Sequence, residues 1–169
     1  MFRDMRRKKQ LLSPEESLQI LENGTSGVLA VAGDDGYPYT VPLSYVYYDS
    51  KIYFHAAKSG HKIDAVRNCS KASFCVIGQD RIVPEKYTSL YRSVIAFGKI
   101  RILENDAEKR DAIERLAVRY NPDADASEID EAIRKDWEPL CMLELTIEHM
   151  TGKEGSELAG ERQMPGGKF

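Results

Sequence analysis

The residues most able to do chemistry lie in one ten-residue segment, Tyr53 to Lys62, with the sequence YFHAAKSGHK. Its first half is typical of a strand, Lys58-Ser59-Gly60 of a turn, and Lys62 to Asn68 of a short helix. The first turn of a helix has unpaired N–H groups and a positive dipole end, which favour anions. Lys58 and Lys62 could each add a charge-assisted hydrogen bond of about 1.5–3 kcal/mol. The segment therefore predicts a site for a phosphate monoester.

Simpler interpretations of the same residues stay open. A strand-turn-helix unit with a lysine is common, so Lys58 and Lys62 are also explained as solvated surface residues. A single histidine is usually structural, and we expect this of His149. For His55 and His61, six residues apart beside the turn, a structural and a functional role are both open.

Several common kinds of site are excluded by the sequence. No GxGxxG follows a predicted strand, neither GxxxxGK[ST] nor HExxH occurs, and Ser156 lacks the glycines of a nucleophile elbow. Cys69, Cys75 and Cys141 have no CxxC spacing, so we expect neither a disulfide framework nor a metal site. This cysteine usage fits a reducing cytoplasm.

The composition is that of one ordered domain. The 169 residues are 42% hydrophobic and 30% charged, close to the globular average. We expect a domain over residues 1–154 and a glycine-rich tail over 155–169. The chain after Thr151 has no apolar period, and we expect it to be mobile unless a partner or cofactor orders it. The net charge of −3 argues against nucleic acid, and no apolar run argues for a membrane span or signal peptide. The N-terminal arm, Arg3 to Lys9, is basic although the chain as a whole is acidic. We expect this arm to be solvated or to embrace a second chain.

The elements that must position the segment are mainly strands. Six are expected, joined in part by short turns that require antiparallel hairpins: 27–32, 37–48, 52–56, 72–77, 93–103 and 140–148. Six strands are enough to curl into a barrel. Pro42 cannot donate a ladder hydrogen bond, which places the second strand at an edge where a ligand could approach the backbone.

Three further helices are expected around the strands. The first begins with Ser13-Pro14-Glu15-Glu16, which combines an N-cap, a proline at the first position and a capping box, and is stopped near Asn23 by a left-handed Gly24. The others cover 106–120 and 127–135. The predicted class is mostly β with flanking helices.

Several blocks, in order, resemble the Nim 5-nitroimidazole resistance proteins, which belong to the pyridoxamine 5′-phosphate oxidase-like flavoproteins. These blocks are MFRDMRRKKQLL, DDGYPYTVPLSYVYYDSKIYFHAAKSGHKIDAVR, SFCV from Ser73, YRSVIAFGKIRI from Tyr91 and LTIEHMTGKE, and they extend to about Glu154. The resemblance implies a six-stranded antiparallel split β-barrel that forms a homodimer, with one FMN at each end of the interface.

The resemblance also implies which residues contact FMN. The strand residues Thr40, Val41, Pro42, Leu43, Ser44 and Tyr45 would lie against the ring, mainly through their backbone. His55, Ala56 and Ala57 would lie along the ribityl chain, and the phosphate would contact Lys58, His61, Lys62, Arg92 and Ser93. Trp137 would either cap the flavin from the other subunit or serve as a core or interface aromatic residue.

The implied activity is FMN-dependent reduction of a nitroaromatic such as a 5-nitroimidazole. His55 or His61 would then donate a proton, since an imidazole changes charge between pH 5 and 8. The alternative is a flavin or haem binder without turnover. A pyridoxamine phosphate oxidase proper is disfavoured because no basic site for a second phosphate is evident.

Overall fold

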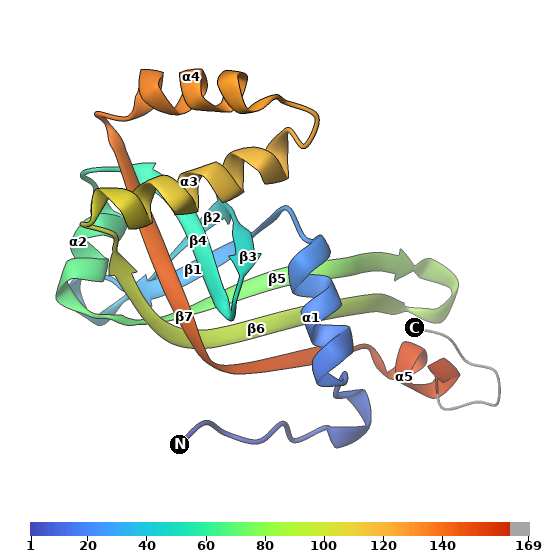
Figure 1. The fold of residues 1–169 in the computed structure, drawn as a ribbon. Helices are drawn as coiled ribbons and strands as arrows, with labels where there is room; N and C mark the ends of the chain where they lie inside the picture. Colours follow the sequence, from blue (N-terminus) through green and yellow to red (C-terminus); the bar gives the residue numbers. More distant parts are fainter. Residues whose placement is uncertain (163–169) are drawn as a thin grey trace.

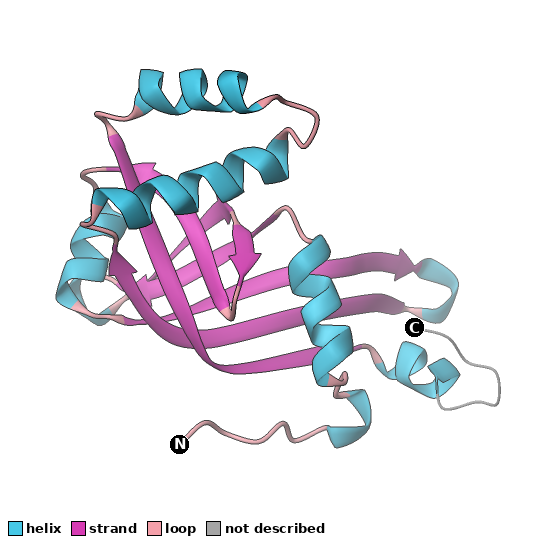
Figure 2. Ribbon diagram, in the orientation of Figure 1, coloured by secondary structure: helices cyan, strands magenta, loops and turns pink. Residues whose placement is uncertain are grey.

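The computed structural model describes residues 1–162, and the expected tail glycines Gly166 and Gly167 lie outside this range. Strands form one continuous curved sheet with helices around it (Figure 2). The strands are β1 (Ser26–Ala32), β2 (Pro38–Ser44), β3 (Val46–Tyr48), β4 (Lys51–Ala57), β5 (Lys71–Val83), β6 (Thr88–Ile102) and β7 (Leu140–Glu154). The helices are α1 (Pro14–Asn23), α2 (His61–Asn68), α3 (Asp106–Tyr120), α4 (Ala126–Asp136) and α5 (Ser156–Arg162). Short helical turns are η1 (Lys8–Gln10), η2 (Asp34–Gly36) and η3 (Pro84–Lys86).

The sheet has seven antiparallel strands in the order β2-β1-β5-β6-β7-β4-β3. β2 and β3 stand at opposite edges of the sheet, yet only Tyr45 separates them in the chain. The sheet must therefore curl until its edges approach one another, as in a split barrel. The expectation of six strands was wrong because the segment 37–48 divides at Tyr45, whose buried side chain donates a hydrogen bond to the carbonyl of Leu21.

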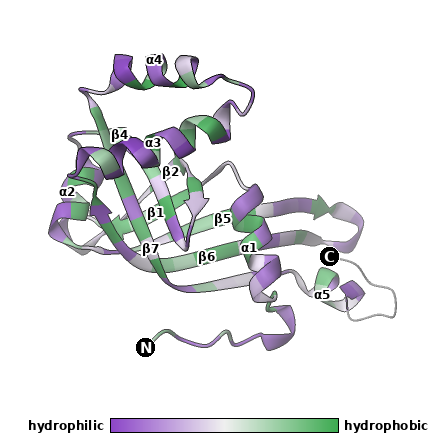
Figure 3. Cartoon of the chain, viewed as in Figure 1, coloured by the Kyte–Doolittle hydropathy of each residue, from purple (hydrophilic) through white to green (hydrophobic). Residues whose placement is uncertain are grey.

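The hydrophobic residues gather mainly on the strands (Figure 3). One core fills the inside of the barrel, where Leu29, Phe54, Phe74, Val94 and Leu143 are almost fully buried. α1 lies across β5, β6 and β7 (Figure 1). A second, smaller core lies between α3 and the outer face of the sheet, and α4 packs on α3. No helix among residues 1–162 is long and apolar enough to cross a membrane.

Local signals in the sequence are confirmed where they depend on neighbouring residues. The capping box at the start of α1 forms in both directions, since Glu16 N donates to Ser13 Oγ at 3.1 Å and Ser13 N donates to a Glu16 carboxylate oxygen at 2.6 Å. The predicted helices 106–120 and 127–135 correspond to α3 and α4. Pro42 does lie on an edge strand, because β2 pairs only with β1.

Two local expectations were wrong. Gly24 ends α1 in an extended conformation with φ −66° rather than a left-handed one. A side chain there would overlap Tyr45 and Val76, so the glycine permits close packing and not an unusual turn. The predicted strands also proved too short: β5 continues past a bulge at Gly78, and β6 begins five residues earlier than Ser93.

The chain beyond Thr151 keeps regular secondary structure as far as Arg162, although its sequence has no apolar period. β7 runs to Glu154, and α5 follows. The Arg162 guanidinium holds α5 in place, with Nε 2.8 Å from Glu154 Oε1 and a terminal nitrogen 2.8 Å from the carboxylate of Glu16. Because Glu154 is fully buried, its contact with the Arg162 guanidinium offsets part of the cost of placing a carboxyl group in the interior.

Candidate functional site

The turn between β4 and α2 has the shape of an anion site. Gly60 occupies the N-cap of α2 with φ 120°, a conformation that favours glycine, and no side chain caps the helix. A Cβ at Gly60 would meet no atom within 4 Å, so the space before the helix is open. The first N–H groups of α2 are therefore accessible to a ligand from solvent.

Three cationic or potentially cationic side chains surround this turn. Lys58 Nζ lies 3.2 Å from Glu138 Oε1, and His61 Nε2 lies 3.5 Å from Asp34 Oδ2. Within residues 1–162 no ion pair engages Lys62, which is half-buried. The turn thus combines uncapped N–H donors with one unneutralised ammonium group.

In the structure, the edge strand β2 lies beside this turn. The ring of Tyr39 on β2 stacks on His61 with centroids 4.0 Å apart. The predicted ring-binding residues follow on the same strand: Thr40 and Pro42 are exposed, while Val41, Leu43 and Ser44 are partly buried. Tyr45 differs, since it is 1% exposed and its side chain belongs to the core. Burial raises the pKa of the Tyr45 hydroxyl, which suits its role as a hydrogen-bond donor inside the protein.

The end of β4 presents alternate residues to opposite faces. His55 and Ala57 are exposed on the outer face, whereas the methyl group of Ala56 lies in the barrel core. Only the backbone of Ala56 is therefore available to a ligand. His55 is held in register opposite Met142 of β7, at the strand that leads into the turn.

Within one chain, Arg92 and Ser93 do not join this group. They pair with Glu154 and Lys153 near the C-terminal end of β7, whereas Ala57 pairs with Leu140 at its start. Fourteen residues of strand separate these ends, about 45 Å along the chain.

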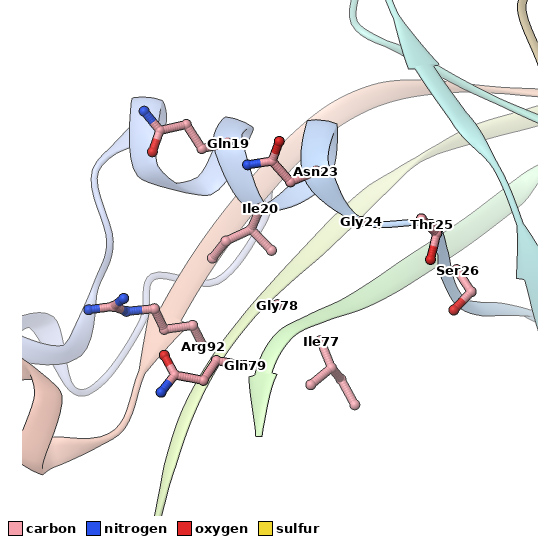
Figure 4. A pocket seen from close by; sticks show the side chains of 10 residues that line it. All are labelled: Gln19, Ile20, Asn23, Gly24, Thr25, Ser26, Ile77, Gly78, Gln79 and Arg92. Carbon is pink, nitrogen blue, oxygen red and sulfur yellow. The ribbon is translucent and has the colours of Figure 1, made fainter. Parts of the chain in front are cut away.

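Arg92 lies in a different hollow, between α1 and the β5–β6 hairpin (Figure 4). This hollow has a volume of about 360 Å³ and is lined mainly by small or uncharged polar side chains: Gln19, Ile20, Asn23, Gly24, Thr25, Ser26, Ile77, Gly78, Gln79 and Arg92. Arg92 Nε lies 3.2 Å from the buried carboxylate of Glu154. Its charge is therefore already engaged in the single chain.

Trp137 lies near the turn, on the segment that connects α4 to β7. The neighbouring Glu138 reaches Lys58, and the indole ring itself lies under the buried Lys109, whose Nζ is 4.0 Å from the ring centre and donates to the Trp137 carbonyl at 3.1 Å. Burial raises the pKa of the adjacent Cys141 thiol, and the surrounding cations, foremost Lys109, oppose that rise. Lys109, Arg67, Lys58 and Lys62 thus lie close enough to Cys141 to act on its pKa.

Sequence reasoning missed the residues that contact the turn from elsewhere. Asp34, Tyr39 and Glu138 come from other loops or strands, and Lys109 comes from α3. Only Tyr39 carried a usable signal, because it lies on the same face of its strand as Val41 and Leu43. The two acidic residues look like ordinary loop residues until the fold brings them to the cations.

Comparisons with known proteins identify the family of the chain. The sequence model described as pyridoxamine 5′-phosphate oxidase matches residues 13–154, which include every strand. A comparison with curated proteins found no significant match.

Solved structures share the fold at low sequence identity. A conserved hypothetical protein from Mycobacterium tuberculosis matches with a TM-score of 0.79 and 18% identity over 98% of each chain. A candidate 5-nitroimidazole antibiotic resistance protein from Bacteroides thetaiotaomicron matches with a TM-score of 0.70 and 21% identity, over 85% of this chain and 86% of that one. An FAD and haem binding protein from Mycobacterium smegmatis matches with a TM-score of 0.68 and 19% identity, over 88% and 74%. At these sequence identities the similarity shows a shared fold.

Proposed function

Because the chain belongs to the pyridoxamine 5′-phosphate oxidase family, we propose that it is a flavoprotein that binds FMN and reduces nitroaromatic compounds such as 5-nitroimidazoles. The observation that carries the proposal is the open, uncapped turn between β4 and α2, with Lys58, His61 and Lys62 around it. A terminal phosphate is the group that fits such a turn, because it is compact, carries about two negative charges and accepts several hydrogen bonds.

The residues around the turn divide into binding roles. Lys58, Lys62 and the first N–H groups of α2 would hold the phosphate. The backbone of Thr40 to Ser44 on the edge strand would contact the ring, next to the stacked pair of Tyr39 and His61. Bound FMN would supply the electron-transfer chemistry, which none of the protein's own side chains provides.

A homodimer follows if Arg92 and Ser93 also contact the cofactor. The two residues lie at the opposite end of β7 from the turn, so in one chain they are too far from Lys62 to hold the same phosphate. They would have to come from a second copy of the chain. The single chain therefore supports a site that a dimer completes, whereas Trp137 already lies near the turn of its own chain.

His55 and His61 are the candidates for proton transfer to the reduced substrate. Both side chains are exposed at the end of β4 and the start of α2, where a substrate beside the flavin could reach them. We expect His55→Ala or His61→Ala to lower turnover more than it lowers FMN affinity. Wild-type turnover in both variants would leave these histidines without a proton-transfer role.

The second candidate is a flavin or haem binding protein without turnover of its own. It is favoured by the likeness to an FAD and haem binding protein. A Soret band in the protein as purified would favour this alternative.

Reoxidation of the bound flavin tests the proposed activity. The full chain is loaded with FMN, reduced under anaerobic conditions and mixed with a 5-nitroimidazole, while the flavin absorbance is followed. The proposal predicts reoxidation at a rate that rises with nitroimidazole concentration and falls to the rate of free reduced FMN in the His55→Ala, His61→Ala double variant. A loaded protein that is not reoxidised would overturn the nitroreductase activity and leave FMN binding intact.

A further inference from the structure

Two exposed carboxylates contact the cations of the β4–α2 turn from outside it. Glu138, between α4 and β7, lies 3.2 Å from Lys58, and its side chain is 94% exposed. Asp34, between β1 and β2, lies 3.5 Å from His61, and its side chain is 81% exposed. The turn is thus flanked by one acidic residue from each of two separate loops.

These pairs contribute little to the fold. Ion pairs this exposed change an equilibrium constant by up to about fivefold. Within residues 1–162, neither the Glu138 nor the Asp34 carboxylate has another ion pair or side-chain hydrogen bond. The buried Glu144 is a contrast: it binds both Lys51 and Arg101 and is 4% exposed. Glu138 and Asp34 therefore differ from the structural carboxylates of this protein in both exposure and number of partners.

Resting on the proposed function, we propose that Glu138 and Asp34 are displaceable counter-ions that occupy the phosphate site of the empty turn and lower its affinity for FMN. In the empty protein they hold Lys58 and His61. A phosphate monoester carries more charge than a carboxylate and accepts more hydrogen bonds, so it displaces both carboxylates. Riboflavin has no phosphate and displaces neither. FAD offers phosphodiester groups, each with a single charge, and competes less well.

The two carboxylates should lower the affinity of the turn for FMN. FMN binding must break the pair between Lys58 and Glu138, and the displaced carboxylate then remains near the bound phosphate and repels it. Removing the charge of Glu138 eliminates both effects and leaves Lys58 in place. The expected gain is about two- to fivefold in FMN affinity for Glu138→Gln, and a smaller gain for Asp34→Asn, since the Asp34–His61 contact is longer and an imidazole pairs with a carboxylate as an ion only when it is protonated.

The test is a calorimetric titration of the full chain, freed of flavin, with FMN and separately with riboflavin. Glu138→Gln, Asp34→Asn and the matched control Glu148→Gln are compared with the wild type. Glu148 is also an exposed carboxylate with one lysine partner, Lys99 at 3.8 Å, but it lies on β7 away from the turn. We expect tighter FMN binding in the first two variants only, and unchanged riboflavin affinity in all three.

The outcomes separate this inference from the proposed function. FMN binding by the wild type with no gain in Glu138→Gln, or an equal gain for riboflavin, would overturn the counter-ion role and leave the flavin site standing. A gain of the same size in Glu148→Gln would also overturn it, since the effect would then come from net charge. If the wild type binds no FMN, the proposed function fails and this inference fails with it.

Discussion

Replacing Lys62 with methionine should weaken FMN binding and leave the fold intact. The substitution keeps most of the half-buried aliphatic chain and removes only the ammonium group. Since no ion pair engages Lys62 within the described residues, the empty protein loses no partner, and its free energy of unfolding should change by no more than about 0.5 kcal/mol.

The size of the binding effect follows from the contact that is lost. One charge-assisted hydrogen bond to a phosphate is worth about 1.5–3 kcal/mol, and each 1.4 kcal/mol is a factor of ten. The expected loss in FMN affinity is therefore about 10- to 150-fold. Lys58 should contribute less, because it must first release Glu138.

The assay is a titration with FMN and with riboflavin, and Lys86→Met is the matched control. Lys86 is an exposed lysine at the tip of the β5–β6 hairpin, at the opposite end of the sheet from α2 (Figure 1). Riboflavin affinity should be the same in all proteins. Unchanged FMN affinity in Lys62→Met, or an equal loss for riboflavin, would refute the assignment of the phosphate to this turn.

Three further substitutions test the turn and two other parts of the fold. Gly60→Ala should cost about 1–3 kcal/mol of unfolding free energy in urea through its φ of 120°, whereas Gly160→Ala, in the open surface of α5, should cost nothing measurable. Burial, together with the nearby carboxylate of Glu144, raises the pKa of Tyr53 from 10 to about 12. The uncharged Tyr53 hydroxyl therefore stabilises the fold fully below pH 10. This contribution, about 2–3 kcal/mol, is lost as the pH rises through 12. Tyr53→Phe should show a smaller fall in stability over that range, and an identical fall would contradict the shift. Arg162→Ala should destabilise the protein by about 1–3 kcal/mol because it leaves the buried Glu154 with fewer cationic contacts, and an unchanged urea midpoint would show that α5 is not held this way.

Local features that depend on residues close together in the chain could be predicted from the sequence. Ser13 and Glu16 are three positions apart, so the capping box that starts α1 needs no information from the rest of the chain. The β4–α2 turn is similar, since Gly60 and the lysines around it are adjacent in sequence.

What the sequence could not predict depends on distant contacts. β2 and β3 read as one strand in the sequence, whereas in the fold the chain crosses at the buried Tyr45 from one edge of the sheet to the other. Nothing near Arg92 in the sequence indicates its pairing with the buried Glu154, which is sixty-two positions away. The docking of α5 likewise depends on contacts between Arg162 and the start of the chain.

Retention of FMN by the purified full chain tests the central claim most directly. The protein is mixed with excess FMN, passed through a gel-filtration column and examined by absorption spectroscopy. If the turn binds the FMN phosphate, the protein peak carries the visible bands of oxidised flavin, and the Lys62→Met variant loses most of them. A colourless protein peak, or equal retention of FMN by Lys62→Met, would contradict it.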